Sequence, residues 1–179
     1  MVGSVDRSKT FNALFGLIQG PKTIVETGTI RSHLWDYKVG DGHSTLRFAE
    51  YCSRFGGKLY SIDIDPHAVV VSKSLVEERF PNADVEIIES DSVAYLKSFR
   101  EPIDVLYLDS ANDANLIFEE LKACLGNLGP ESVVLIDDCF NKGDYDVEKG
   151  ELVIPYLEEN GWIMEASEYQ ALFIHKDRF

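Results

Sequence analysis

Long apolar runs, paired cysteines and clusters of basic residues are all missing from this sequence. No apolar stretch approaches the ~20 residues that span a bilayer, so we expect no membrane segment. The three cysteines, Cys52, Cys124 and Cys139, are far apart and form no CxxC pair, which argues against a structural zinc site or a CxxC redox site. The first residues lack a basic region followed by an apolar stretch. We therefore expect no signal peptide and a cytoplasmic protein.

Positive charge is also scarce. The chain carries 31 acidic and 17 basic residues, a formal net charge of −14, and its basic residues are scattered. A surface this negative repels nucleic acid backbones and anionic membranes. We therefore expect neither nucleic acid nor a membrane as a partner.

The chain has the composition and length of one globular domain. Its 179 residues are 45% hydrophobic and 27% charged, so we expect a single domain over residues 1–179. Short apolar runs alternate with amphipathic stretches along most of the chain. The pattern predicts a leading helix over 8–20, within an N-terminal segment 1–20. It predicts strands over 23–27, 58–62, 85–88, 104–108 and 132–136, and helices over 45–55, 67–80, 92–99 and 115–128.

The order of these elements predicts the fold class. Alternating strands and helices imply parallel strands with helices on both faces of the sheet. After a helix near 151–160, strands 161–165 and 171–175 follow each other too closely for a crossover helix, so they should pair as an antiparallel hairpin. We expect a Rossmann-like three-layer α/β sandwich whose mostly parallel seven-stranded sheet ends in an antiparallel β-hairpin.

Each predicted parallel strand is followed by at least one carboxylate. In a doubly wound sheet the ligand lies beyond the carboxyl ends of the strands. A single acid there is often only a helix cap or a turn residue. Acids after all five strands favour a binding site at that edge: Glu26, Asp63, Asp91, Asp109 and Asp137.

The motifs at these strand ends resemble a known family. In order they are ETGT (26–29), GDGHST (40–45), LYSIDIDP (59–66), ESDS (89–92), LYLDS (106–110) and LIDD (135–138). Their order and spacing resemble the class I S-adenosylmethionine (SAM)-dependent methyltransferases, and most of all the metal-dependent small-molecule O-methyltransferases. The resemblance extends from about residue 23 to the C-terminus.

The resemblance implies a set of cofactor-binding residues. Gly28 would let the backbone turn tightly and approach the ligand. Glu26 would accept hydrogen bonds from the methionine portion, and Asp63 would bind the ribose hydroxyls. An acidic pocket suits a sulfonium cofactor, which is positively charged and has no phosphates. The full set is Glu26, Gly28, Ser44, Asp63, Asp91 and Ser92.

Three further acids form a candidate metal site. Asp109, Asp137 and Asp138 should lie on neighbouring strand ends, where three carboxylates repel one another unless they are protonated or bridged by a cation. Oxygen ligands favour a hard ion such as Mg²⁺. The resemblance implies that this ion holds the acceptor hydroxyl and lowers its pKa. The alternative is that no metal binds, with Asp109 as a helix cap and Asp138 solvated.

The catalytic base departs from the family pattern. Relatives often place a His or Lys shortly after the acid of the fourth strand, but here Ser110, Ala111 and Asn112 follow. We rank Asp109 first as the catalytic residue, with Asp113, His33 and His43 as other candidates.

The acceptor site should come from segments peculiar to this chain. An insertion over residues 30–41 carries His33, Trp35, Tyr37 and Lys38, and loops this long in compact domains are usually functional. The loop 139–150 is a second candidate, and another subunit is a third, so we expect a possible homodimer.

The sequence therefore predicts a SAM-dependent methyltransferase that O-methylates a small hydroxylated molecule with the help of a divalent cation. One alternative is a degenerate protein that binds SAM or its demethylated product without turnover. A more remote one is a dinucleotide-binding oxidoreductase, because Gly40 and Gly42 resemble part of a GxGxxG motif. They lie too far beyond the strand end at Thr27 for that motif.

Overall fold

The computed structural model describes residues 7–33, 43–140 and 148–178, which build a seven-stranded sheet. The strand order is β3-β2-β1-β4-β5-β7-β6. The first five strands pair in parallel, and β7 is antiparallel to both β5 and β6. The predicted sheet and its closing hairpin are thus confirmed. The strands are β1 (Lys22–Thr27), β2 (Gly57–Asp63), β3 (Val85–Glu89), β4 (Ile103–Leu108), β5 (Leu128–Ile136), β6 (Trp162–Ser167) and β7 (Ala171–His175).

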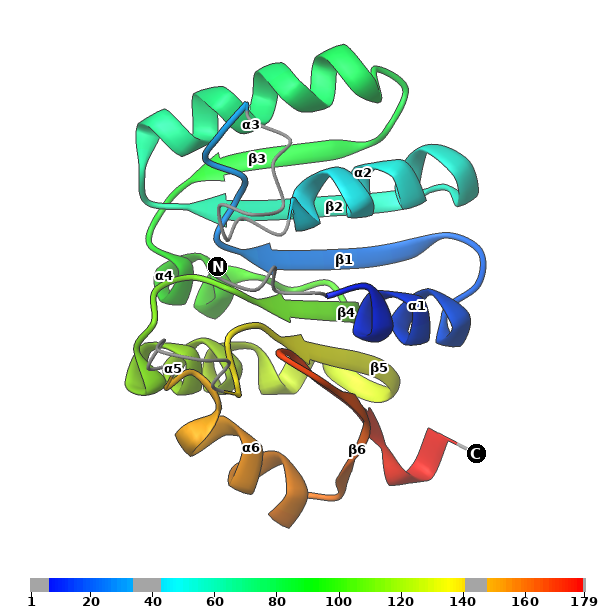
Figure 1. The fold of residues 1–179 in the computed structure, drawn as a ribbon, viewed down its shortest axis with the longest axis vertical. Coiled ribbons are helices and arrows are strands. Elements are labelled where there is room, and N and C mark those ends of the chain that lie inside the picture. The colour runs from blue at the N-terminus through cyan, green and yellow to red at the C-terminus, as the bar shows by residue number, and fades with distance from the viewer. Residues whose placement is uncertain (1–6, 34–42, 141–147, 179) are drawn as a thin grey trace, which may run out of the picture.

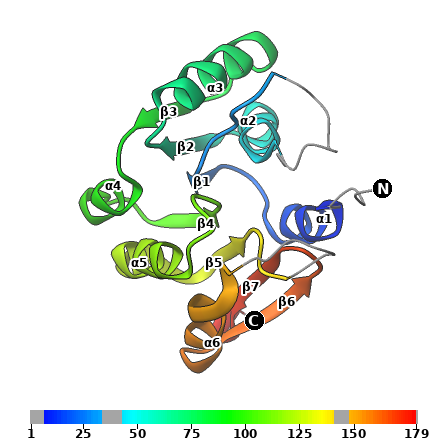
Figure 2. The ribbon, with the colours of Figure 1, turned by 60° about the vertical axis from the view of Figure 1, so that its left-hand side comes forward.

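Helices cover both faces of this sheet (Figures 1 and 2). On one face lie α1 (Ser8–Leu17), α2 (Ser44–Phe55) and α3 (Pro66–Arg79). On the other lie α4 (Ser92–Ser98), α5 (Ala114–Cys124) and α6 (Gly150–Glu159). This is the three-layer arrangement that the alternation of strands and helices predicts.

The buried strands contribute side chains to both layers of the core. In β4, Val105 and Tyr107 pack in the cluster with α1 and α2, whereas Leu106 and Leu108 pack in the cluster with α4, α5 and α6. Successive side chains of a strand point to opposite faces. Because both faces are covered, the central strands are apolar at nearly every position, as a parallel sheet requires.

Several helices begin at an aspartate that follows a strand or loop. The carboxylates of Asp65, Asp91 and Asp113 accept backbone N–H groups of α3, α4 and α5, at 2.9 Å (His67 N), 2.8 Å (Ala94 N) and 2.8 Å (Asn115 N). Such caps satisfy donors that have no partner within the helix.

The leading helix is shorter than predicted. It ends at Leu17 because Ile18 is extended, with ψ 143°. Gly20 then takes a positive φ of 68° before Pro21 leads into β1. Most of the predicted insertion (34–41) and of the predicted acceptor loop (141–147) lies outside the described residues.

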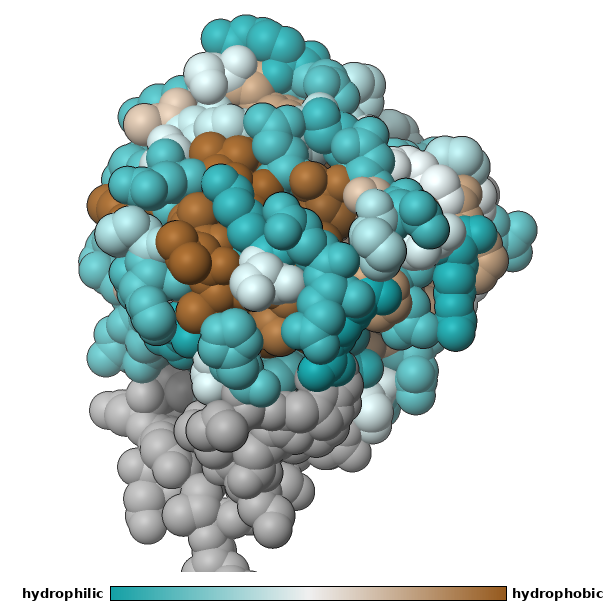
Figure 3. Space-filling model, turned by 90° about the horizontal axis from the view of Figure 1, so that it is seen from above, coloured by the Kyte–Doolittle hydropathy of each residue, from teal (hydrophilic) through white to brown (hydrophobic). Residues whose placement is uncertain are grey.

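Apolar side chains reach the surface at the α3 and β3 end of the sheet. Figure 3 shows this end, where apolar groups are separated by hydrophilic ones. Val70 of α3 is 65% exposed. None of the helices within residues 7–33, 43–140 and 148–178 is long and apolar enough to cross a membrane.

Candidate active site

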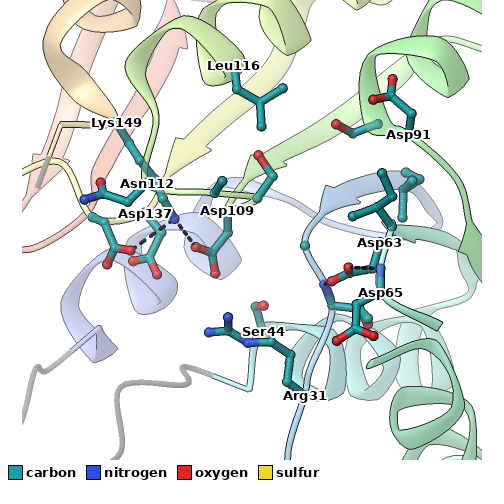
Figure 4. Close-up of a pocket in the computed structure, with 18 of the residues that line it drawn as sticks. Arg31, Ser44, Asp63, Asp65, Asp91, Asp109, Asn112, Leu116, Asp137 and Lys149 are labelled. Atoms are coloured by element: carbon teal, nitrogen blue, oxygen red, sulfur yellow. Dashed lines mark hydrogen bonds and ion pairs between the residues drawn. The ribbon is translucent and has the colours of Figure 1, made fainter. Parts of the chain in front are cut away.

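A cavity of about 450 Å³ opens at the carboxyl ends of the parallel strands. This volume lies in the range of small-molecule and cofactor sites. Of the predicted cofactor-binding and metal-binding residues, all except Glu26 line this cavity. Figure 4 shows two ends, with Asp63, Asp65 and Asp91 at one and Asp109, Asp137 and Lys149 at the other.

Gly28 holds the ends of β1 and β4 close together. Its φ is +82°, and a Cβ at this position would lie 2.2 Å from the backbone oxygen of Asp109. The Gly28 N–H donates to the Ile62 oxygen at 2.8 Å, and the Asp109 N–H donates to the Thr27 oxygen at 2.9 Å. The structure thus requires a glycine here for packing against β4, in addition to the predicted approach to a ligand.

Glu26 lies beneath the cavity instead of lining it. Its side chain is fully buried, and its carboxylate accepts hydrogen bonds from the hydroxyls of Ser44, Thr45 (2.8 Å) and Ser61 (2.5 Å). Ser44, at the start of α2, lines the cavity. In this arrangement Glu26 orients Ser44, and the direct contact between Glu26 and the cofactor stays a prediction.

Asp63 is fixed by backbone donors at the end of β2. Its Oδ2 accepts from Thr29 N at 2.9 Å, and its Oδ1 accepts from Asp65 N at 2.8 Å. A carboxylate has about four acceptor sites, so lone pairs remain for further hydroxyl donors. The ribose contact predicted for Asp63 is compatible with this geometry.

Asp91 and Ser92 lie where β3 passes into α4. Asp91 caps α4, as described above, and also lines the cavity. The Ser92 hydroxyl donates to the buried carboxylate of Glu120, which also accepts from the Thr27 hydroxyl at 2.9 Å. Burial raises the pKa of Glu120. Both predicted residues therefore have structural partners on the chain as well as a place at the cavity.

The acidic triplet converges as predicted, but a lysine lies within it. One ligand atom from each of Asp109, Asp137 and Asp138 lies within 4.8 Å of the others. Lys149 Nζ lies 2.5 Å from Asp109 Oδ1 and 3.0 Å from Asp138 Oδ2. The Lys149 side chain is only 2% exposed. Its ammonium thus bridges two of the three carboxylates (Figure 4).

Arg7 pairs with the third carboxylate from the opposite side. Its Nε donates to Asp137 Oδ1 at 2.8 Å and its Nη2 to Asp137 Oδ2 at 2.7 Å, a bidentate arrangement. Nη2 also lies 3.3 Å from Asp138 Oδ1. The arginine precedes α1, so the N-terminal helix brings a cation to the far end of the site.

These pairs set the charges of the site. Burial lowers the pKa of Lys149, but the carboxylates of Asp109, Asp138 and Asp137 outweigh it, so the pKa lies above its ordinary value. Burial would raise the pKa of Asp137, but the hydrogen bonds from Arg7 outweigh it and lower the pKa. Burial and the Asp137 charge raise the pKa of Asp109, which Lys149 opposes.

A divalent cation does not fit this arrangement. The positive charges of Lys149 and Arg7 already compensate most of the charge of the three carboxylates, and Lys149 Nζ stands between Asp109 and Asp138, where a bridging ion would have to lie. A second cation there would be repelled by the ammonium. The predicted convergence of the acids is therefore observed, while the residues present do not support the predicted magnesium site.

The sequence interpretation missed Arg7 and Lys149. Lys149 falls within the predicted acceptor loop 139–150 but carries no local signal of its own. Its place is set by Asn112, whose Oδ1 accepts from Glu148 N at 3.1 Å, and by Gly150, where a Cβ would lie 2.7 Å from Ile154 Cδ1 and 3.3 Å from Cys139 Cβ. Arg7 precedes the first helix and lacks a neighbouring motif, so nothing local in the sequence marks it as a site residue.

The other candidate bases do not line the cavity. Asp113 caps α5, and His43 is only 4% exposed at the start of α2. His33 is exposed, and none of these three lines the cavity as described. Trp35, Tyr37, Lys38, Gly40 and Gly42 lie outside the described residues.

Residues 38–139 match the family described as "Methyltransferase domain". The chain belongs to this family. This match favours a methyltransferase over a dinucleotide-binding oxidoreductase. The family resemblance predicted from the motifs is confirmed.

Curated relatives share part of this chain. The O-methyltransferase ankF of Aspergillus thermomutatus is 22% identical over 103 residues, 57% of this chain and 43% of that protein. A polyamine aminopropyltransferase of Neisseria meningitidis is 33% identical over 93 residues, 51% of this chain and 34% of that protein. The chain thus spans less than half the length of these curated relatives.

Solved structures share the fold. A candidate caffeoyl-CoA O-methyltransferase from Staphylococcus aureus superposes with a TM-score of 0.69 at 16% identity, covering 97% of this chain and 86% of that chain. A candidate methyltransferase from Streptococcus mutans, in complex with S-adenosylhomocysteine (SAH), gives 0.64 at 13% identity, covering 93% and 95%. At such low identity these likenesses show the fold.

Proposed function

We propose that the chain binds SAM in the strand-end cavity and transfers the methyl group to a hydroxyl oxygen of a small acceptor. The observation that carries the proposal is one cavity that joins Asp63 at the end of β2 to Asp109 at the end of β4. Ligands of open α/β sheets bind at this edge. Family membership and the SAH complex of the Streptococcus mutans structure support SAM as the cofactor.

The residues at the Asp63 end fit the cofactor. Asp63 accepts the ribose hydroxyls, and the loop at Asp91 and Ser92 borders the adenine. Arg31 lines the same cavity and supplies a cation for the cofactor's α-carboxylate. Ser44, oriented by Glu26, supplies a hydroxyl beside the methionine portion.

The Asp109 end supplies the acceptor chemistry. The cofactor's sulfonium makes its methyl group electrophilic: transfer breaks the carbon–sulfur bond, forms a carbon–oxygen bond and leaves SAH. The acceptor hydroxyl must lose its proton, and Asp109 is the cavity residue we assign to take it. Burial and Asp137 raise the pKa of Asp109, which makes it a stronger base than an exposed aspartate. No metal step enters, because Lys149 already bridges the acids.

Calorimetry with SAM and SAH tests the cofactor site. We expect both to bind the wild-type chain, and Asp63→Ala to weaken SAM binding by about 10-fold or more because each strong polar contact contributes about 1.5–3 kcal/mol. Asp177→Ala is the matched control, since this carboxylate is 65% exposed in the C-terminal 3-10 turn. The absence of heat with either nucleoside would rule out the proposal.

A methyl-transfer assay then distinguishes the proposal from its alternatives. With labelled SAM and a panel of small hydroxylated acceptors, a methyltransferase releases SAH and a methylated product. A degenerate binder gives calorimetric heat but no product across the panel.

Aminopropyl transfer is a second candidate function. It is favoured by the 33% identity to the Neisseria aminopropyltransferase and by the acidic cavity, which suits a cationic amine. Decarboxylated SAM with a diamine would then yield methylthioadenosine instead of SAH. The match to a methyltransferase domain argues against this function.

A further inference from the structure

The Lys149 ammonium occupies the centre of the acceptor end of the cavity. It contacts Asp109 from β4 and Asp138 from the end of β5, at 2.5 and 3.0 Å, and its side chain is 2% exposed while it lines the cavity. Placing a charge in so buried a position is costly unless it is paired and hydrogen-bonded. Here both conditions are met.

We propose that Lys149 is the resident cation of this site, in place of a divalent metal, and that it binds and polarises the acceptor oxygen. The proposal rests on the proposed methyl transfer. It adds that the transfer needs no divalent cation and that Lys149 is a catalytic residue. An ammonium beside the acceptor oxygen stabilises the negative charge that develops as the hydroxyl loses its proton.

The backbone around Lys149 holds this position. Asn112 lies two residues before the start of α5, and its Oδ1 accepts the Glu148 N–H at 3.1 Å, which anchors the residue before Lys149. Gly150, the residue after it, lies against Cys139: a Cβ at this position would lie 3.3 Å from Cys139 Cβ, and 2.7 Å from the end of the Ile154 side chain. Both neighbours of Lys149 in the chain are thus fixed, which limits where its side chain can reach.

The backbone also positions Asp138 for its contact with Lys149. It takes a left-handed conformation with φ 48°, which is uncommon for a residue other than glycine. The next residue fixes this turn, because the Cys139 N–H donates to the Tyr169 oxygen at 2.9 Å. The conformation turns the carboxylate toward Lys149 and Arg7, whose nitrogens lie 3.0 and 3.3 Å away.

This replacement has a consequence for the acceptor. A metal ion can bind two adjacent acceptor oxygens at once, whereas an ammonium is a point charge with three single donors. Among the described residues, two of those donors are directed to Asp109 and Asp138, which leaves one for the acceptor. We therefore assign to this chain acceptors with a single acidic hydroxyl, such as a monophenol, with no requirement for a vicinal diol.

Electron paramagnetic resonance of Mn²⁺ tests the site without any activity readout. In wild-type protein, with and without SAH, we expect the spectrum of free Mn²⁺. Stoichiometric binding of Mn²⁺ that Asp109→Asn abolishes would overturn the proposal. Because SAH binding is measured separately by calorimetry, failure of the cofactor site is recognised independently of the metal result.

Substitutions of Lys149 test its place directly. Lys149→Met removes the charge, and Lys149→Arg keeps it. Lys122→Met is the control, because Lys122 lies on the outer side of α5, where it pairs with Glu119 and lies over the Phe118 ring of the same helix. We expect Lys149→Met to bind SAH as wild type, to gain Mn²⁺ binding and to lose about 100-fold or more in methyl transfer, and Lys149→Arg to retain part of the activity. A folded Lys149→Met protein that binds no Mn²⁺ or keeps full activity would overturn the proposal.

If Lys149→Met does not fold, as judged by circular dichroism, assays of the wild-type protein still test the proposal. We expect methyl transfer to be unchanged by a chelator and to be as fast on a monophenol as on the matching catechol. Loss of activity on chelation, restored by Mg²⁺, would overturn the proposal.

Discussion

Gly28 shows how one residue without a side chain can fix a whole site. Because a Cβ here would lie 2.2 Å from the Asp109 oxygen at a φ of +82°, Gly28→Ala must push β1 away from β4. A left-handed alanine alone costs about 1–2 kcal/mol. We expect the free energy of unfolding, measured with urea, to fall by more than about 2 kcal/mol, and SAM binding to weaken. Gly16→Ala in α1 is the control: nothing lies within 4 Å of its Cβ, so it should be neutral or stabilising by up to about 1 kcal/mol. Equal effects of the two substitutions would contradict this account.

Two buried thiols predict a loss of stability at alkaline pH. Burial raises the pKa of Cys52 and of Cys124 from 9.0 to about 12. Above pH 9 the unfolded chain ionises these thiols while the folded chain keeps them protonated, so the free energy of unfolding falls as the pH rises toward 12. We expect the double variant Cys52→Ala, Cys124→Ala to lose less stability between pH 8 and pH 11 than wild type, in urea titrations. Parallel pH profiles would show that the thiols make no contribution.

The residues that the sequence revealed are those with a local signal. Asp63 and Asp109 could be predicted because each directly follows an apolar strand, and the sheet then brings the strand ends together. Arg7 and Lys149 pair with acids 130 and 40 positions away, and neither belongs to a motif. Only the folded chain shows that two cations offset most of the charge of the three carboxylates, and this is why the sequence predicts a magnesium site that the structure does not support.

At the scale of elements, the aspartates that cap α4 and α5 allow effects on stability to be separated from effects on cofactor binding. Asp91 caps α4 and lines the cavity, whereas Asp113 caps α5 and does not line it. Loss of an N-cap costs about 1 kcal/mol. We expect Asp91→Ala and Asp113→Ala to be similarly destabilised in thermal unfolding, while only Asp91→Ala weakens SAM binding in calorimetry.

Asp91→Asn completes this comparison, because asparagine caps a helix as well as aspartate but carries no charge. We expect wild-type stability with weakened SAM binding. An Asp91→Asn protein that binds SAM as wild type does would assign Asp91 to helix capping alone.

Element order was predictable, and element ends were less so. The hairpin of β6 and β7 followed from a gap too short for a helix, a purely geometric constraint. The predicted helix over 115–128 instead ends at Cys124 and continues as a 3-10 turn over Leu125–Asn127, after which β5 begins at Leu128. Apolar periodicity alone could not separate these, because the same leucines suit a helix, a turn and a buried strand.

For the whole molecule, charge decides which acceptors can approach. The net charge of −14 surrounds a cavity whose mouth carries Asp63, Asp65 and Asp91. A nucleic acid would have to bring its phosphates against these carboxylates, and binding to phosphates requires clustered cations that release counterions. Three cations line the described cavity: Lys149 and Arg7 are paired with acids, and Arg31 is the residue that we assign to the cofactor's α-carboxylate.

We therefore expect a fluorescently labelled RNA hairpin to show no change in anisotropy with up to about 10 μM protein, even at 50 mM salt, where non-specific binding is strongest. A small neutral or cationic hydroxylated acceptor meets no such barrier, so the same preparation should remain active on the acceptor panel. Saturable RNA binding that weakens steeply with added salt would show that a basic surface outside the described residues outweighs the net charge. The acceptor would then have to be sought among polynucleotides.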